Sequence, residues 1–243
     1  MSGRALLDWG AAGARHLPRD VGVTVVVDVL SFTTTVGIAC ERGMTVLPYH
    51  EYENAQRFAD EHDAVLARRR DRHDRSAISL SPDSVRRCVD PPARLVLPSP
   101  NGSTISQLLG GGGRAVIAAS LRNADAVAAH VHRDHPDTVV AVIAAGERWE
   151  DGSLRPAVEA LWGAGAVLDA LARRGRPDLS PEALAAVHAW RGAAADASRT
   201  LHDTVTGREL DALGFPDDVR VAGEIGASTV VPVMDGDVYR AAR

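Results

Sequence analysis

Aromatic side chains are scarce in this chain and make up 4% of its 243 residues. Alanine, valine and leucine therefore have to supply most of the packing in a core. Apolar residues amount to 45% and charged residues to 24%, which is ordinary for a globular protein that buries a core. We expect a single α/β domain over residues 1–243, with 1–150 and 151–243 as alternative sub-lobes.

Cysteine is rare as well, since only Cys40 and Cys88 are present and they form no CxxC pair. This excludes the disulfide framework of a small secreted protein. No stretch approaches the roughly 18 consecutive apolar residues that a transmembrane helix needs. The N-terminal segment also lacks the apolar core of a signal peptide. We therefore expect a cytoplasmic protein with no membrane partner.

A surplus of positive charge is missing, because 27 basic residues face 32 acidic ones and give a net charge of −5. Proteins that bind nucleic acid or anionic membranes normally carry a basic surplus, so we expect neither partner. The basic cluster RRRDRHDR at 68–75 is interrupted by acids and is typical of a solvated loop. The sequence also lacks the HxxxH, HExxH, Walker, GxGxxG and GxSxG motifs, so neither a zinc site nor an acyl hydrolase is expected.

The first half of the chain alternates apolar strands with helices, which predicts a mainly parallel sheet covered on both faces. Strands are predicted at 23–29, 45–49, 64–67, 93–99, 114–120 and 138–146, and helices at 33–43, 51–62, 81–88, 103–109 and 123–134. The second half is predicted to be helical, at 154–175, 180–194, 206–214 and 216–226. Its last segment, 228–241, is predicted to be a hairpin at the edge of the sheet.

Most of the unusual polarity in the first half follows the ends of four strands. These segments are DVLSFTTT (28–35), SPNGS (99–103), SLRNAD (120–125) and AAGERWEDGS (144–153). In parallel α/β sheets, ligands bind beyond the carboxyl ends of the strands. The sequence therefore predicts a site there, at one edge of the sheet.

Asp28 is the strongest candidate in this group. A carboxylate at the end of a buried strand is costly unless it is paired or bound to a cation. Mg²⁺ binds carboxylates together with water and substrate phosphate, and Glu147, Glu150 or Asp151 could add a second ligand or a general base. The helix starts at Thr33 and Ser103 offer N–H groups to an anion, although each hydroxyl taken alone is equally typical of an N-cap. The glycine after Asn101 would let the backbone approach a ligand closely.

Six segments occur in an order that is more specific than any one of them: VVVDVLSFTTTV, LPSPNGS, ASLRNADAVA, VIAAGERWEDGSLRPAVE, GAGAVL and TGRELDALGFPDDV. Together, over about residues 21–235, they resemble the 2-phosphosulfolactate phosphatase family, the ComB-like proteins. The resemblance implies a three-layer α/β/α fold with a mixed, mainly parallel sheet, and a Mg²⁺-dependent phosphatase. In that family, 2-phosphosulfolactate is hydrolysed to sulfolactate and phosphate on the route to coenzyme M.

The resemblance also implies roles for individual residues, motif by motif. The implied catalytic residues are Asp28, Glu147 and Asn101, and the implied Mg²⁺ ligands are Asp28, Glu147 and Glu159. From its helical pattern alone, Glu159 could equally be a surface residue. The implied phosphate-binding or substrate-binding residues are Ser31, Thr33, Thr34, Ser99, Gly102, Ser103, Asn123 and Arg208. A homodimer is compatible with the sequence.

Two positions depart from the family pattern. Ser31 stands where members of the family often have arginine, so a guanidinium with bidentate geometry is missing there. Ala160 stands where a second acid would follow Glu159. Arg68, Arg69 or Arg70 could supply the missing positive charge. Two interpretations stay open: a phosphatase acting on 2-phosphosulfolactate or a related phospho-hydroxy acid, with water as the favoured nucleophile, or a non-catalytic small-anion-binding protein derived from the family.

Overall fold

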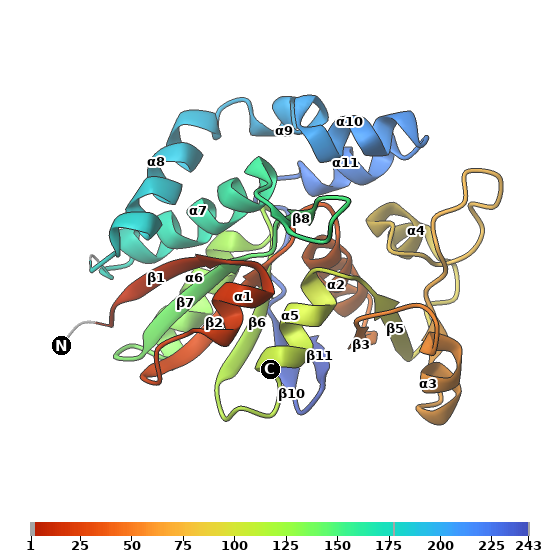
Figure 1. The fold of residues 1–243 in the computed structure, drawn as a ribbon, viewed down its shortest axis with the longest axis horizontal. Helices are drawn as coiled ribbons and strands as arrows, with labels where there is room; N and C mark the ends of the chain where they lie inside the picture. The colour runs from red at the N-terminus through yellow and green to blue at the C-terminus, as the bar shows by residue number, and fades with distance from the viewer. Residues whose placement is uncertain (1–2, 177, 243) are drawn as a thin grey trace.

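Figure 1 shows the fold of the chain in the computed structural model, which describes residues 3–176 and 178–242. The strands are β1 (Ala5–Trp9), β2 (Val21–Val27), β3 (Thr45–Tyr49), β4 (Val65–Leu66), β5 (Arg94–Pro98), β6 (Ala115–Ala119), β7 (Val139–Ala144), β8 (Glu147–Arg148), β9 (Leu154–Arg155), β10 (Pro232–Asp235) and β11 (Val238–Ala241). The α-helices are α1 (Gly10–Arg15), α2 (Phe32–Glu41), α3 (Ala55–Glu61), α4 (Pro82–Arg87), α5 (Gly102–Leu109), α6 (Ala124–Asp134), α7 (Val158–Arg173), α8 (Pro181–Ala193), α9 (Ala197–Thr200), α10 (Val205–Ala212) and α11 (Pro216–Ala222). A 3-10 turn, η1, covers Leu201–Asp203.

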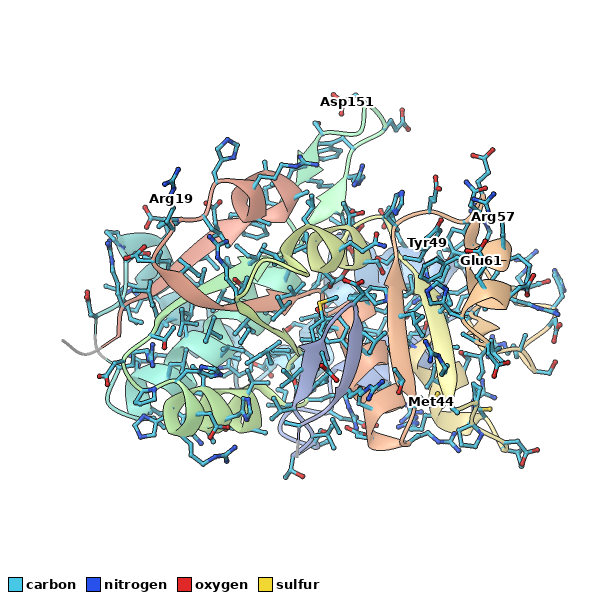
Figure 2. All side chains as sticks on the ribbon, turned by 90° about the horizontal axis from the view of Figure 1, so that it is seen from below. Arg19, Met44, Tyr49, Arg57, Glu61 and Asp151 are labelled. Atoms are coloured by element: carbon cyan, nitrogen blue, oxygen red, sulfur yellow. The ribbon has the colours of Figure 1, made fainter. Side chains whose placement is uncertain are left out.

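Nine strands form one mixed sheet in the order β1-β7-β2-β6-β10-β11-β3-β5-β4. The group β1, β7, β2 and β6 is parallel, and so is the group β3, β5 and β4. Hairpin β10–β11 lies between them and pairs antiparallel with β6 on one side and with β3 on the other. Because these three pairings are all antiparallel, the strands of the two groups point in opposite directions. In Figure 2 the orange β3 and yellow β5 run upright, whereas the strands of the other group lie across the view.

Strand β2 shows why helices cover both faces of the sheet. Val23, Val25 and Val27 are fully buried on one face, in a core shared with α6, α7 and α8. Val26 is equally buried on the other face, where it packs in a core with Phe32 of α2. Side chains of a strand alternate between its faces, so a strand this apolar needs cover on both sides. The predicted three-layer α/β/α fold with a mixed, mainly parallel sheet is thereby confirmed.

Local sequence accounts for where several helices begin. Ser81 and Ser180 each precede a proline, and their hydroxyl oxygens accept the backbone N–H three residues on, over 3.1 and 3.2 Å. Thr204 accepts the N–H of Gly207 over 3.0 Å in the same way. Such caps satisfy a donor that a helix start leaves unpaired, and proline fits the first turn because it lacks an N–H.

Three features differ from the prediction. Strand β1 and helix α1 were not predicted, although β1 forms one edge of the sheet beside β7. The hairpin predicted over 228–241 exists, but it lies in the middle of the sheet, where the ring of Tyr239 is fully buried. The helix predicted from 154 begins at Val158, because Leu154–Arg155 pairs with Glu147–Arg148 and Pro156 lacks an N–H for the ladder.

Across the described ranges, no helix combines the length and the apolar character that crossing a membrane requires.

Candidate active site

Asp28 follows β2 directly, and its buried carboxylate joins the starts of two helices. The backbone N–H of Phe32, in α2, donates to Oδ1 of Asp28 over 3.3 Å. The backbone N–H of Gly102, in α5, donates to Oδ2 over 3.0 Å. Both donors belong to the first turn of a helix, where N–H groups have no partner within the helix. The carboxylate of Asp28 therefore binds N–H groups at the two helix starts where the sequence suggested an anionic ligand.

The close approach of α5 to Asp28 depends on glycine at position 102. A Cβ atom added to Gly102 would lie 2.8 Å from Oδ2 of Asp28 and would also overlap the ring of Phe32. Real Cβ atoms avoid such distances, so a side chain here would push α5 away from β2.

Glu147 lies on β8, beyond the end of β7, and faces the loop that precedes α5. The amide Nδ2 of Asn101 donates to Oε2 of Glu147 over 2.8 Å. The amide oxygen of Asn101 accepts a hydrogen bond from Nε of Arg148 over 3.1 Å, and Nη2 of Arg148 donates to the carbonyl of Pro100 over 2.7 Å. Asn101 is thus fixed between an acid and a base that are neighbours in the chain.

Glu159 is the third acid of the group and lies in the first turn of α7. It is 3% exposed, and its Oε1 has no hydrogen-bond partner among the described residues. A buried carboxylate oxygen without a donor is costly. The charge of Glu159 acts on both Asp28 and Glu147, so the three carboxylates form one electrostatic group.

Burial and electrostatic repulsion favour the protonated forms of Asp28 and Glu147. Desolvation raises the pKa of Asp28 to about 6, although the N–H donors of Phe32 and Gly102 act in the opposite direction. Desolvation, together with the charges of Asp28 and Glu159, raises the pKa of Glu147 to about 8. Buried acids with raised pKa values are typical of catalytic sites and of sites that receive a cation.

Arg70 supplies a positive charge opposite these acids. Its Nη2 donates to Oγ of Ser31 over 2.7 Å and to the carbonyl of Leu80 over 3.3 Å. Its Nε donates to Oδ2 of Asp218 over 2.8 Å. Asp218 is fully buried at the start of α11 and also accepts the hydroxyl of Ser81. The guanidinium is therefore held in one orientation by groups from distant parts of the chain.

A cavity of about 190 Å³, which we call the Asp28 cavity, lies between Asp28, Glu147 and Arg70. Its walls are formed by Asp28, Leu30, Ser31, Arg70, Leu80, Ser99, Pro100, Asn101, Glu147, Thr206, Glu209, Leu210 and Leu213. Five of the residues selected from the sequence line it: Asp28, Ser31, Ser99, Asn101 and Glu147.

The other selected residues do not line this cavity. The hydroxyls of Thr33, Thr34 and Ser103 are fully buried and donate to the backbone carbonyls of Asp28, Val29 and Leu97, each over 2.8 Å. These three hydroxyls thus hold the turn after β2 and the start of α5 in place.

Glu159, Asn123, Arg208 and Gly102 also lie outside its walls. Asn123 holds the N-cap position of α6, but its side chain bonds elsewhere: it accepts the N–H of Ser120 over 2.8 Å and donates to the carbonyl of Val230. Arg208 is exposed on α10. Gly102 contributes its backbone N–H to Asp28 and lies behind the wall.

Sequence reasoning missed the wall that α10 contributes. Thr206, Glu209, Leu210 and Leu213 line the cavity, whereas Arg208 points elsewhere. The missed residues are spaced at i, i+3, i+4 and i+7, which places them on one face of a helix, and position 208 lies off that face. This spacing could have identified them.

The acids of the site fit a divalent cation that takes only two protein carboxylates. Among residues 3–176 and 178–242, no group of three or more His, Cys, Asp or Glu side chains is gathered as a ready metal site. Mg²⁺ commonly uses one or two carboxylates and completes its shell with water and phosphate oxygens. The buried, unpaired Oε1 of Glu159 and the raised pKa of Asp28 fit such a two-carboxylate site.

Comparison with known families agrees with this geometry. The family model described as 2-phosphosulpholactate phosphatase matches residues 13–237 of the 243. The matched range contains every residue that lines the Asp28 cavity, including the acids, Asn101 and Arg70. The chain therefore belongs to the 2-phosphosulfolactate phosphatase family, whose members are phosphoric monoester hydrolases.

Proposed function

We propose that this protein is a Mg²⁺-dependent phosphatase that hydrolyses a small phospho-hydroxy acid, 2-phosphosulfolactate or a close relative, to the hydroxy acid and phosphate. The observation that carries the proposal is the placement of Arg70 and Ser31 in one cavity with Asp28 and Glu147. A phosphoester needs cationic and hydrogen-bonding groups for its oxygens and an acid for its leaving group, and this cavity contains both.

Arg70 and Ser31 are the proposed phosphate-binding pair. The Nη2 atom of Arg70 already donates to Oγ of Ser31, so both groups face the same point of the cavity wall. Guanidinium groups bind phosphate through charge-assisted hydrogen bonds, often two at a time. The fixed bond from Arg70 to Asp218 keeps this donor oriented before the substrate arrives.

Asp28 and Glu159 are the residues that would hold Mg²⁺. Both are buried and both contribute negative charge to the same region, and Oε1 of Glu159 lacks a partner among the described residues. When bound, Mg²⁺ would supply charge neutralisation to the phosphate oxygens. The two N–H donors on Asp28 fix the direction in which its carboxylate points.

Glu147 is the proposed proton-transfer residue. Burial raises the pKa of Glu147 and so favours its protonated form, from which it would donate a proton to the alkoxide that leaves the phosphorus. The amide of Asn101 holds Oε2 and thereby orients the other oxygen. We propose water as the nucleophile, because both oxygens of Asp28 already accept backbone N–H groups.

The test is phosphate release from a panel of phosphorylated small acids that includes 2-phosphosulfolactate and phospholactate, in Mg²⁺ and in EDTA. The expected result is turnover that requires Mg²⁺ and is lost in Asp28→Asn. Folded protein that binds members of the panel without turnover would instead identify the alternative, a non-catalytic anion-binding protein. If 2-phosphosulfolactate is the best substrate, the proposed pathway is the one to coenzyme M.

A further inference from the structure

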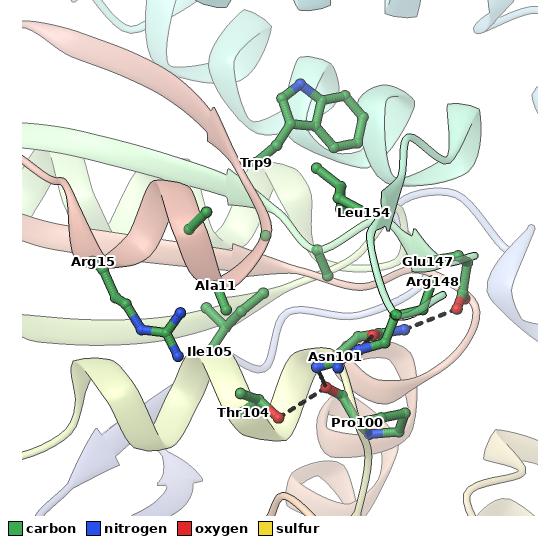
Figure 3. A pocket seen from close by; sticks show the side chains of 14 residues that line it. Trp9, Ala11, Arg15, Pro100, Asn101, Thr104, Ile105, Glu147, Arg148 and Leu154 are labelled. Carbon is green, nitrogen blue, oxygen red and sulfur yellow. Dashed lines mark hydrogen bonds between the residues drawn. The ribbon is translucent and has the colours of Figure 1, made fainter. Parts of the chain in front are cut away.

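A second cavity lies on the other side of the Asn101–Glu147 pair, and Figure 3 shows it from close by. We call it the Trp9 cavity. Its volume is about 260 Å³, and its walls come from the end of β1, helix α1, the start of α5 and the β8–β9 hairpin. Pro100, Asn101 and Glu147 line both cavities and form the partition between them.

The polar side of the Trp9 cavity carries two guanidinium groups, from Arg15 and Arg148. Within the described part of the chain, Arg15 has no carboxylate partner and Nη1 of Arg148 has no hydrogen-bond partner. The only acid in the wall, Glu147, is already bonded to Asn101. With two guanidinium groups against one carboxyl group, the wall of the cavity is rich in positive charge, although the whole chain carries a net charge of −5.

The remaining wall is apolar. In Figure 3 the indole of Trp9 lies beside Leu154, and Ala11 and Ile105 lie between these residues and the guanidinium of Arg15. A cavity that combines an aromatic face with a pair of guanidinium groups suits an organic acid better than a free inorganic ion. Inorganic phosphate alone would leave the apolar wall without a partner.

We propose that the Trp9 cavity binds a small organic acid, one carboxylate or sulfonate on a short apolar body, while the Asp28 cavity separately binds phosphate. Arg15 and Arg148 pair with the anionic group, and Trp9 and Leu154 pack against the body. This site goes beyond the proposed phosphatase activity, because it is detected by binding alone, without turnover. The hydroxy acid product and an unrelated metabolite acid share this chemistry.

The experiment is calorimetric titration of the full chain with benzoate, and with benzamide as an uncharged molecule of the same shape. Benzoate is expected to bind at one site per chain and benzamide roughly tenfold or more weakly, since a charge-assisted pair is lost. Saturating inorganic phosphate is expected to leave benzoate binding unchanged. Displacement of benzoate by phosphate, equal binding of benzamide, or no benzoate binding at all would overturn the proposal.

Variants locate the site. Arg15→Met and Arg148→Met are each expected to weaken benzoate binding roughly tenfold, and because both arginines are exposed, the fold is expected to persist. Arg70→Met is the matched control, which should weaken phosphate binding and leave benzoate binding intact. If Arg70→Met weakened benzoate binding and Arg15→Met did not, benzoate would bind in the Asp28 cavity and the second site would be refuted. These outcomes are independent of whether any phosphoester is hydrolysed.

Discussion

Nη2 of Arg70 donates a hydrogen bond to Oγ of Ser31 over 2.7 Å, across 39 positions of the chain. The resemblance described in the sequence analysis implies an arginine at the position of Ser31. In this chain the guanidinium beside position 31 comes from Arg70, and Ser31 accepts its hydrogen bond. This pairing is the basis of the first two predictions.

Replacing Arg70 by methionine should raise KM for the phosphoester roughly tenfold to a hundredfold, because a charge-assisted pair to phosphate is lost. The measurement is steady-state kinetics together with inorganic phosphate binding. Arg69→Met is the matched control, since the guanidinium of Arg69 lies over the ring of Tyr52, outside the walls of the Asp28 cavity. Equal effects of the two substitutions would contradict the role given to Arg70.

Replacing Asp218 by asparagine should lower the free energy of unfolding by about 3 kcal/mol, because Arg70 would keep a largely buried charge without its partner. Phosphate affinity should fall as well, since Nε of Arg70 would lose its fixed position. Urea unfolding and phosphate titration measure the two effects. Asp217→Asn should cost about 0–1 kcal/mol, because Asp217 forms an exposed pair with Arg220. A neutral result at position 218 would show that the buried pair does not hold Arg70.

The metal-free protein should lose stability as the pH rises from about 4 to about 8. In the folded chain, the pKa of Asp28 is raised to about 6 and that of Glu147 to about 8, from ordinary values of 3.8 and 4.5. Between about pH 4 and about pH 8 the folded state binds more protons than the unfolded state. The stability that these two acids contribute is therefore fully present below about pH 4 and is lost as the pH rises toward 8.

Urea unfolding in EDTA at several pH values measures this loss, which is on the order of a few kcal/mol. Asp28→Asn and Glu147→Gln should each flatten the profile. Adding Mg²⁺ should restore stability chiefly at the alkaline end, where the carboxylates are ionised and free to bind it. Stability that rises with pH in EDTA would show that these acids are stabilised as carboxylates by groups of the protein.

Replacing Gly102 by alanine should destabilise the fold by about 1–3 kcal/mol and abolish most activity, since the new Cβ would collide with Asp28 and Phe32. Gly192→Ala, in helix α8, offers a control because nothing lies within 4 Å of its added Cβ. That substitution should stabilise the helix by about 0.5–1 kcal/mol. Thermal unfolding and phosphate release on both variants would check the pair, and an active, stable Gly102→Ala enzyme would refute the tight packing at the site.

Local patterns in the sequence predicted the strand that leads to Asp28, because a run of valines followed directly by an acid is typical of a buried strand that leads into a site. They also predicted that Asn101 and Glu147 would lie near Asp28, and all three residues line the Asp28 cavity. The roles of Thr33 and Ser103 could not be separated in the same way, since a hydroxyl at a helix start can bind either backbone or ligand. The structure shows these hydroxyls bonded to the backbone carbonyls of Asp28 and Leu97.

Long-range placements could not be predicted from single segments. The sequence offered Arg68, Arg69 and Arg70 as equivalent sources of charge, and the contact of Arg70 with Asp218, 148 residues away, decides among them. The central position of hairpin β10–β11 in the sheet could not be predicted either. An alternating apolar pattern is compatible with an edge strand as well as with a strand that has neighbours on both sides. Burial of Tyr239 between two parallel groups is a property of the whole sheet.

The central hairpin has a consequence for how the enzyme is made. Asp28 and Glu147 follow strands of one parallel group, whereas Asn101 follows a strand of the other, and β10–β11 is the bridge that joins the two groups. A ribosome releases that bridge after every residue of the site has already emerged. A nascent chain that stops short of residue 232 would contain every residue that lines the Asp28 cavity and would still lack the hairpin that joins the two groups of strands.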